Sequence, residues 1–258
     1  MPLSGSGLWY EFHGPEDGQV VILSPGMGGS ARYWDPNLPA LSAAHRVLLY
    51  DHRGTGRSDR TLPDEVTIDA MAEDVVALIA ELGVQSPNFI GHALGGLIGL
   101  DLAARGMLGR LVVINGWADL DPHFARCFDI RLGILHSQGP EAYARAQPLF
   151  LYPATWISEN LARLDEEAAH QVAHFPPVAT LEKRIAAARA FVLPAGVTGP
   201  VLLVSAADDM LVPVTSSRKL ADLLADHAVY VETSRGGHAC NVTDPDTFNT
   251  LVLDFLGS

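Results

Sequence analysis

A chain of 258 residues with 48% hydrophobic content is long enough to bury a large core in a single globular body. Its 30 acidic and 17 basic residues give a net charge of -13, which argues against nucleic acid as a partner. The same charge disfavours attraction of anions from a distance, so an anionic substrate would depend on local donors.

The start of the chain and its cysteines bear on location and metal binding. The opening MPLSGSGLWYEFHG has no basic and apolar signal regions, and no apolar run reaches the roughly 18 residues that a membrane span needs. Cys127 and Cys240 form no disulfide framework and no C-x-x-C pattern. We therefore expect a cytoplasmic protein without membrane association or bound metal, and whether it forms a homodimer is left open.

Six short runs rich in β-branched residues alternate with helical patterns along the chain. Between the second and third runs, apolar residues recur at helical spacing from Met71 to Leu82, behind the capping candidates Thr67 and Asp69. This alternation predicts an α/β fold in which helices flank a mostly parallel central sheet. The runs are QVVILSPG (19–26), RVLLYDHRG (46–54), PNFIGHA (87–93), RLVVING (110–116), VLLVSAADD (201–209) and AVYVET (228–233).

Strand signals stop between about Trp117 and Pro200, where aromatics, prolines and helical segments take their place. Because two strands and a closing helix follow, this segment reads as an insertion rather than a separate tail. We predict a core formed by residues 1–117 and 199–258, and a helical lid at 118–198. The lid is expected over the carboxyl edge of the sheet, where open α/β sheets bind ligands.

The stretch FIGHALGG (89–96) has the strand, glycine and helix pattern of a nucleophile elbow, G-x-S-x-G, but Ala93 stands at the serine position. An acid and a histidine follow in the order typical of α/β-hydrolases. Asp209 is chosen over Asp208 as the acid, although adjacent aspartates could simply cap a turn. His238, in the loop RGGHACN, is the candidate base, with a purely structural histidine as the alternative.

The glycine-rich SPGMGGS (24–30) directly follows the first long run. In this fold the oxyanion donors are backbone N–H groups from such a loop and from the residue after the nucleophile. Met27 and Leu94 are therefore the expected donors, and the alanine at position 93 leaves them intact. A tight strand-to-helix turn is an equally valid description of the same loop.

Several other residues are weaker candidates. Arg53 could contact substrate, although stabilisation of its own turn is the simpler role. Trp117 is expected at the root of the lid, where it contributes to lid packing first and lines the substrate pocket second. His92 is interpreted as a packed core histidine, and Cys240 has only its nearness to His238 to recommend it as a nucleophile.

The order of these motifs resembles the α/β-hydrolase superfamily over nearly the whole chain. The resemblance is closer to the RutD family, the aminoacrylate or carbamate hydrolases of the Rut pyrimidine-utilisation pathway. It implies a small, labile nitrogen compound from uracil breakdown as substrate, no cofactor, and an elbow alanine that is natural. The strings that carry it are GHALGG (91–96), NGW (115–117), QPLFLYPATW (147–156), HF (174–175) and GGHACNVTDP (236–245).

Three functions remain open at the level of sequence. The first is a hydrolase in which His238, oriented by Asp209, activates water directly, since an alanine cannot form an acyl-enzyme. The second is a binding protein that has kept the pocket but lost the chemistry. The third is an ordinary serine hydrolase in which Ala93 replaces the natural serine.

Overall fold

The computed structural model describes residues 3–257 and contains one seven-stranded sheet in the order β1-β3-β2-β4-β5-β6-β7. β1 pairs with β3 in an antiparallel manner, and the pairings among the other strands are parallel. The strands are β1 (Tyr10–His13), β2 (Val20–Ser24), β3 (Arg46–Tyr50), β4 (Asn88–His92), β5 (Leu111–Ile114), β6 (Val201–Ala206) and β7 (Ala228–Thr233).

Eleven α-helices and two short 3-10 helices accompany the sheet within the described residues. The helices are α1 (Leu38–Ala44), α2 (Ile68–Glu81), α3 (Leu94–Ala104), α4 (Pro122–Ala146), α5 (Pro148–Leu151), α6 (Ala154–Glu159), α7 (Leu161–Ala173), α8 (Val178–Ala190), α9 (Val214–Leu224), α10 (Cys240–Thr243) and α11 (Pro245–Gly257), with η1 (Ala31–Trp34) and η2 (Ala225–His227). In the described part of the chain, no helix is long and apolar enough to cross a membrane.

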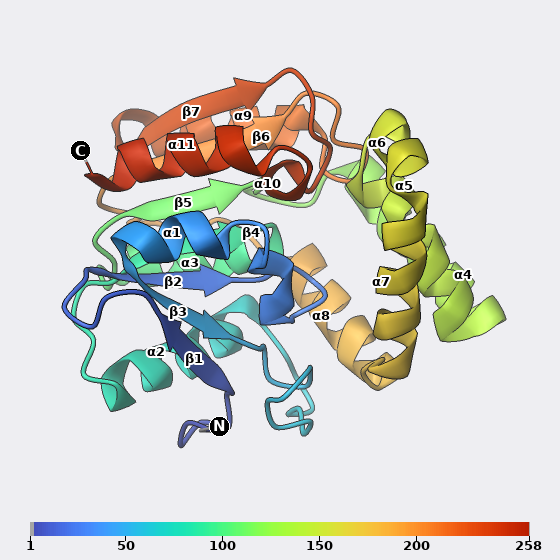
Figure 1. Ribbon diagram of the computed structural model, residues 1–258, viewed down its shortest axis with the longest axis horizontal. Coiled ribbons are helices and arrows are strands. Elements are labelled where there is room, and N and C mark those ends of the chain that lie inside the picture. The colour runs from blue at the N-terminus through green and yellow to red at the C-terminus, as the bar shows by residue number, and fades with distance from the viewer. Residues whose placement is uncertain (1–2, 258) are drawn as a thin grey trace.

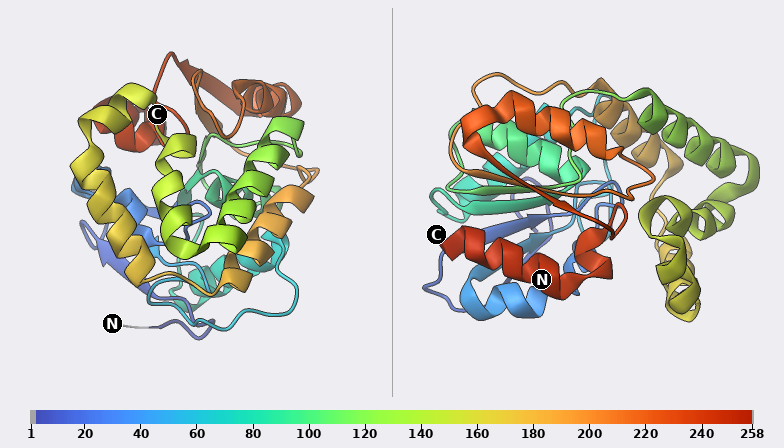
Figure 2. Two further views of the ribbon diagram at one scale, coloured as in Figure 1. Left: turned by 90° about the vertical axis from the view of Figure 1, so that its right-hand side faces the viewer. Right: turned by 90° about the horizontal axis from the view of Figure 1, so that it is seen from above.

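Helices cover both faces of the sheet, as the α/β prediction requires. Figure 1 and Figure 2 show α1 and α11 on one face and α2, α3 and α9 on the other. Each face has its own apolar cluster, one including Trp34, Leu41 and Val252 and the other including Val75 and Leu97. The predicted α/β-hydrolase fold, with its mostly parallel sheet, is confirmed.

The six predicted strands are all present, and the structure adds one that the sequence reading missed. β1 is an edge strand of four residues, all of them half-buried, and it lacks the apolar run that marks the buried strands. The predicted crossover helix is α2, and the hydroxyl of Thr67 caps it by accepting from the N–H of Ala70 at 3.0 Å.

Helices α4 to α8 all lie between β5 and β6 in the chain, and Figure 1 shows them beyond the arrowheads of the parallel strands. α4 is kinked at Gly139, which has a φ of 83° and precedes Pro140. The two ends of the segment meet where the N–H of Leu193 donates to the carbonyl of Ala118 at 2.8 Å. The exact domain boundaries at 117/118 and 198/199 stay a prediction.

Candidate active site

Ala93 sits at the sharp turn from β4 into α3 with φ 48° and ψ -112°. A positive φ is uncommon for a residue with a Cβ, and it is the strained conformation that the nucleophile elbow adopts. The N–H of Ala93 donates to the carbonyl of Ile114 on β5 at 2.8 Å, which fixes the turn against the sheet. The backbone is therefore that of an elbow, although the side chain is a buried methyl group.

The glycines on either side of Ala93 are required by close packing between strand and helix. A Cβ at Gly91 would collide with the backbone of Gly95, and a Cβ at Gly95 would collide with the carbonyl oxygen of Ser24. The second collision shows that the start of α3 lies directly against the chain that leads into the loop 25–30. The G-x-A-x-G spacing thus brings that loop and the N-terminus of α3 together.

This arrangement bears on the predicted oxyanion donors, Met27 and Leu94. Leu94 is the first residue of α3, so its N–H has no acceptor within the helix. Met27 lies in the adjoining loop, and its carbonyl oxygen accepts from Nη1 of Arg184 at 3.2 Å. Both residues thus belong to segments in contact, while their role as donors stays a prediction.

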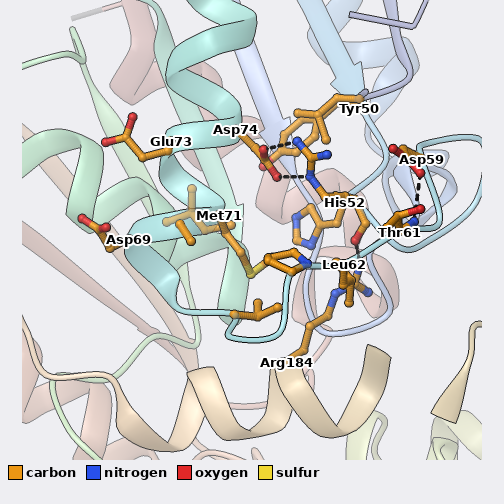
Figure 3. A pocket seen from close by; sticks show the side chains of 16 residues that line it. Tyr50, His52, Asp59, Thr61, Leu62, Asp69, Met71, Glu73, Asp74 and Arg184 are labelled. Carbon is orange, nitrogen blue, oxygen red and sulfur yellow. Dashed lines mark hydrogen bonds and ion pairs between the residues drawn. The ribbon is translucent and has the colours of Figure 1, made fainter. Parts of the chain in front are cut away.

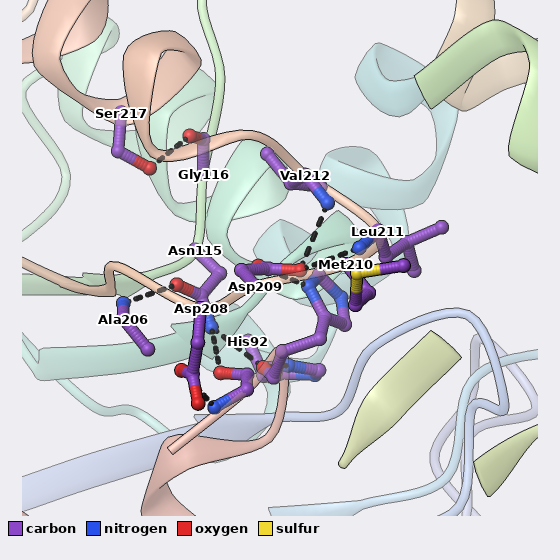
Figure 4. A network of polar contacts seen from close by, with 12 residues as sticks. His92, Asn115, Gly116, Ala206, Asp208, Asp209, Met210, Leu211, Val212 and Ser217 are labelled. Atoms are coloured by element: carbon purple, nitrogen blue, oxygen red, sulfur yellow. Dashed lines mark hydrogen bonds and ion pairs between the residues drawn. The ribbon is translucent and has the colours of Figure 1, made fainter. Parts of the chain in front are cut away.

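His238 and Asp209 form a buried pair, and Figure 4 shows Asp209 with its neighbours Leu211 and Val212. Nδ1 of His238 lies 2.8 Å from Oδ2 of Asp209, and the side chains are only 3% and 0% exposed. Oδ1 of Asp209 also accepts from the N–H groups of Leu211 and Val212 at 2.7 and 2.9 Å. Both oxygens of the Asp209 carboxylate are hydrogen-bonded, so the carboxylate is fixed in position. Because a carboxylate accepts, Nδ1–H of His238 is the donor, which leaves Nε2 to act as a base.

The neighbouring Asp208 has a different partner. Its Oδ1 accepts from the N–H of Gly237 at 2.8 Å, so it holds the backbone of the loop that carries His238. The two adjacent aspartates therefore have different partners: Asp209 contacts the imidazole of His238, and Asp208 contacts the backbone of the loop. The choice of Asp209 as the partner of His238 agrees with these contacts.

Asn115 at the end of β5 also holds this loop, and the sequence analysis missed that role. Its Nδ2 donates to the carbonyl oxygens of His238 at 2.6 Å and Gly237 at 3.3 Å, while its Oδ1 accepts from the N–H of Ala206 at 3.2 Å. Its φ of 49° is in the left-handed region, which asparagine tolerates better than most residues. An asparagine directly after a parallel strand was the signal that could have indicated it.

His92 packs beneath the same loop. Its Nε2 donates to the carbonyl of His238 at 2.8 Å, and its ring stacks on Tyr33 with centroids 4.6 Å apart. Burial, together with the nearby His238, holds the pKa of His92 well below its ordinary value. His92 is therefore a neutral, packed histidine that supports the loop.

The two candidate substrate contacts are Trp117 and Arg53. Trp117 is 1% exposed and packs against Phe124 with ring centroids 4.5 Å apart, at the point where the chain leaves β5 for α4. Arg53 forms an ion pair with Asp74 at 2.5 Å and donates to the carbonyl of Ser6. Its guanidinium is thus engaged away from the Asp209–His238 pair, and substrate contact by either residue stays a prediction.

Cys240 is not poised to replace the absent serine. Burial raises the pKa of its thiol to about 12, so the reactive thiolate is scarce at neutral pH. Burial also raises the pKa of Cys127. Within residues 3–257, no cluster of three or more His, Cys, Asp or Glu residues could hold a metal ion.

The helices between β5 and β6 touch both loops of the site. The carbonyl of Leu151 in α5 accepts from the N–H of Ala239 at 3.1 Å, next to His238. The thiol of Cys127 in α4 lies 3.7 Å from the carbonyl of Met210, next to Asp209. These contacts place α4 and α5 against the loops of the candidate acid and base.

Comparison with known proteins agrees with this geometry. A model described as the alpha/beta hydrolase fold matches residues 19–131. The chain is also similar to the enol-lactonase from Burkholderia xenovorans LB400, with a TM-score of 0.86 and 28% identity, over 97% of this chain and 96% of that one. The fold and site thus define an α/β-hydrolase.

Curated relatives narrow the assignment. The chain is 47% identical to RutD of Agrobacterium fabrum strain C58 over 96% of this chain and 98% of that protein. It is 49% identical to RutD of Caulobacter vibrioides strain NA1000 over 97% and 95%. Both relatives are named "Putative carbamate hydrolase RutD". The chain belongs to the RutD family of α/β-hydrolases.

Proposed function

We propose that the protein is a cofactor-independent hydrolase of pyrimidine (uracil) catabolism that cleaves a C–N bond in a small labile compound, carbamate or 3-aminoacrylate. The observation that carries the proposal is the buried 2.8 Å contact between His238 and Asp209 beside an elbow that presents Ala93. The names of the relatives point to carbamate, and the resemblance to the RutD family adds 3-aminoacrylate and uracil breakdown. The acid–base pair supplies the chemistry.

Direct attack by water is the mechanism that these residues support. With a methyl group at position 93, no acyl-enzyme forms there. His238 instead takes a proton through Nε2 from a water in the space that a serine hydroxyl would fill, while Asp209 stabilises the imidazolium. The N–H groups of Met27 and Leu94 then hold the developing negative charge.

The overall reactions balance without any further reagent. Carbamate and water give ammonia and bicarbonate. 3-Aminoacrylate tautomerises to an imine, to which water adds, and loss of ammonia then leaves the aldehyde form of the three-carbon acid. Both reactions need water and proton transfers rather than a covalent intermediate.

The rate enhancement that His238, Asp209 and the backbone N–H donors must provide is modest. In serine proteases, loss of the triad serine costs on the order of a millionfold, yet roughly a thousand- to ten-thousandfold over water remains from the oxyanion hole and binding. That remainder suits a compound which already decomposes by itself. A labile substrate and an elbow without serine are therefore compatible.

The alternatives from the sequence are a binding protein and a serine hydrolase altered at position 93. A binding protein has no need for a histidine that is oriented by a buried aspartate, so the contact between His238 and Asp209 favours catalysis. The match to RutD proteins over nearly the whole chain argues against an ordinary serine hydrolase. The cytoplasmic location and the homodimer stay predictions.

A time course of ammonia release tests the proposal, with carbamate and 3-aminoacrylate generated in the presence and absence of protein. We expect wild-type protein to exceed the spontaneous rate, His238→Ala to lose most of that excess, and Asp209→Asn to lose a large part of it. Equal release by wild type and His238→Ala from both compounds would overturn the hydrolase for these substrates and favour the binding role.

A further inference from the structure

A cavity of about 570 Å³ lies outside the candidate active site, between the chain that follows β3 and helix α2. Figure 3 shows its lining, with Tyr50 and His52 at the end of β3, Met71 and Asp74 on α2, and Arg184 reaching in from α8. Ala93, Leu94, Met27 and His238 are not among the lining residues. The proposed hydrolysis therefore gives this cavity no role.

Arg184 is a fully buried cation, and no carboxylate among the described residues is hydrogen-bonded to it. Its Nη1 donates to the carbonyl of Met27 at 3.2 Å and its Nη2 donates to the carbonyl of Arg53 at 2.7 Å. Its Nε has no hydrogen-bond partner among the described residues. Burial lowers the pKa of Arg184 to about 10, so the guanidinium is still charged at neutral pH.

The nearby buried acid does not balance this charge. Asp51 interacts with Arg184 electrostatically, but its side chain is bonded to Arg57 at 2.8 and 3.0 Å and to the N–H of Ala31 at 2.8 Å. One carboxylate therefore faces two guanidinium groups. A buried charge without a partner is costly, and an anion in the cavity would remove that cost.

His52 offers a second donor in the same lining. It is 2% exposed, and its Nδ1 has no hydrogen-bond partner within the described chain. Nε2 lies 3.4 Å from Oγ of Ser24, which is 2.7 Å from the hydroxyl of Tyr50. If Tyr50 donates to Ser24 and Ser24 donates to Nε2, the proton of the neutral ring is on Nδ1, which is then a buried donor without an acceptor among the described residues.

The other residues that line the cavity determine which kind of anion would fit there. The walls include the apolar side chains of Leu8, Leu62, Val66, Met71 and Ile98. Asp59, Asp69 and Glu73 also line the cavity, and Arg53 is already paired with Asp74. These acids oppose a multiply charged anion, whereas the apolar walls favour a hydrocarbon body.

We propose that this cavity binds an organic monocarboxylate, with its carboxylate between Nε of Arg184 and Nδ1 of His52 and its apolar body against Leu62 and Met71. The ligand would share Arg184 with the loop of Met27, so its binding would be linked to the position of the predicted oxyanion loop. The proposal does not depend on which bond the protein hydrolyses, or on whether it hydrolyses one.

Calorimetric titration with benzoate tests it, with benzamide as the uncharged analogue of the same shape. We expect saturable binding of benzoate in the millimolar range or tighter, at least tenfold tighter than that of benzamide, and no competition from inorganic phosphate. Absence of benzoate binding would overturn the proposal. Equal binding of benzamide or competition by phosphate would overturn the assigned ligand class.

Three variants locate the site. Arg184→Gln is expected to weaken benzoate binding at least tenfold, because a charge-assisted hydrogen bond is lost. Arg189→Gln is the matched control on the same helix, since Arg189 pairs with Asp129 away from the cavity. Leu62→Trp fills the cavity without touching the guanidinium and should also abolish binding, which keeps the test decisive if Arg184→Gln does not fold.

One further variant separates this cavity from the active site. His238→Ala should leave benzoate affinity unchanged, because His238 is not part of the lining. Loss of benzoate binding in His238→Ala, with affinity retained in Leu62→Trp, would place the carboxylate at the candidate active site and overturn the proposal. Either result leaves the ammonia-release test of the proposed hydrolysis intact.

Discussion

The side-chain amide of Asn115 donates to the carbonyl oxygen of His238 at 2.6 Å and thereby joins the end of β5 to the loop of the candidate base. The same carbonyl accepts from Nε2 of His92 at 2.8 Å. Two buried donors from neighbouring strands thus fix the backbone of the residue whose imidazole pairs with Asp209. The position of the base is set by the sheet as well as by the acid.

Asn115→Gly is expected to slow ammonia release about tenfold or more, because the loop of His238 loses a donor, and to cost about 1–3 kcal/mol of unfolding free energy. Glycine avoids the strain that other residues would meet at a φ of 49°. Enzyme kinetics and urea denaturation measure the two effects. The control is Asn88→Ala, which removes a buried acceptor for the N–H of Arg110 far from His238; it should lose stability while keeping activity.

Ala93→Ser should create activity toward an activated ester such as p-nitrophenyl acetate. The elbow conformation already exists at Ala93, so a hydroxyl there would face the imidazole of His238. A burst of p-nitrophenol followed by slow turnover is the expected signal. The double variant Ala93→Ser with His238→Ala should lose it, and a folded single variant without burst or turnover would count against the proposed geometry.

Gly95→Ala is expected to destabilise the protein by about 1–3 kcal/mol, since the added methyl group collides with the carbonyl oxygen of Ser24. Urea denaturation gives the change in unfolding free energy. Gly133→Ala on α4 is the matched control, because an added Cβ there meets nothing within 4 Å and alanine favours a helix. If both variants were equally stable, the close approach at the elbow would be wrong.

Stability should fall as the pH drops from 7 to 5, in part through His92. The pKa of His92 is lowered by burial in the folded protein, so below about pH 6.5 the unfolded chain takes up a proton that the folded protein does not. This group therefore lowers the unfolding free energy by up to about 1.4 kcal/mol per pH unit in that range.

Urea denaturation at several pH values measures this slope. We expect His92→Gln to flatten it by about one proton while its amide still donates to the carbonyl of His238. The exposed His227 provides the control, because His227→Gln removes an imidazole from the surface of the protein. A slope in His92→Gln identical to that of wild type would show that His92 is not buried in its neutral form.

Much of the architecture could be predicted from the sequence because it depends on local patterns. The buried parallel strands appear as continuous apolar runs, and the hydroxyl of Thr67 caps the helix that follows it. The glycines around Ala93 mark a turn that only they permit. The order of elbow, acid and histidine indicated Asp209 and His238, and the structure places these two side chains 2.8 Å apart, while their catalytic roles stay a prediction. β1 was missed because a half-buried edge strand carries no such run.

Only the tertiary structure decided which partners these residues find, because those partners are distant in the chain. Asp208 and Asp209 are adjacent, and folding alone assigns one to the N–H of Gly237 and the other to the imidazole of His238. Arg53 pairs with Asp74 because the packing of α2 brings that carboxylate to the loop after β3. A local pattern indicates which residues are buried and which residue caps a helix. Ion pairs and long-range hydrogen bonds depend instead on contacts between segments that are distant in the chain, and a local pattern does not contain that information.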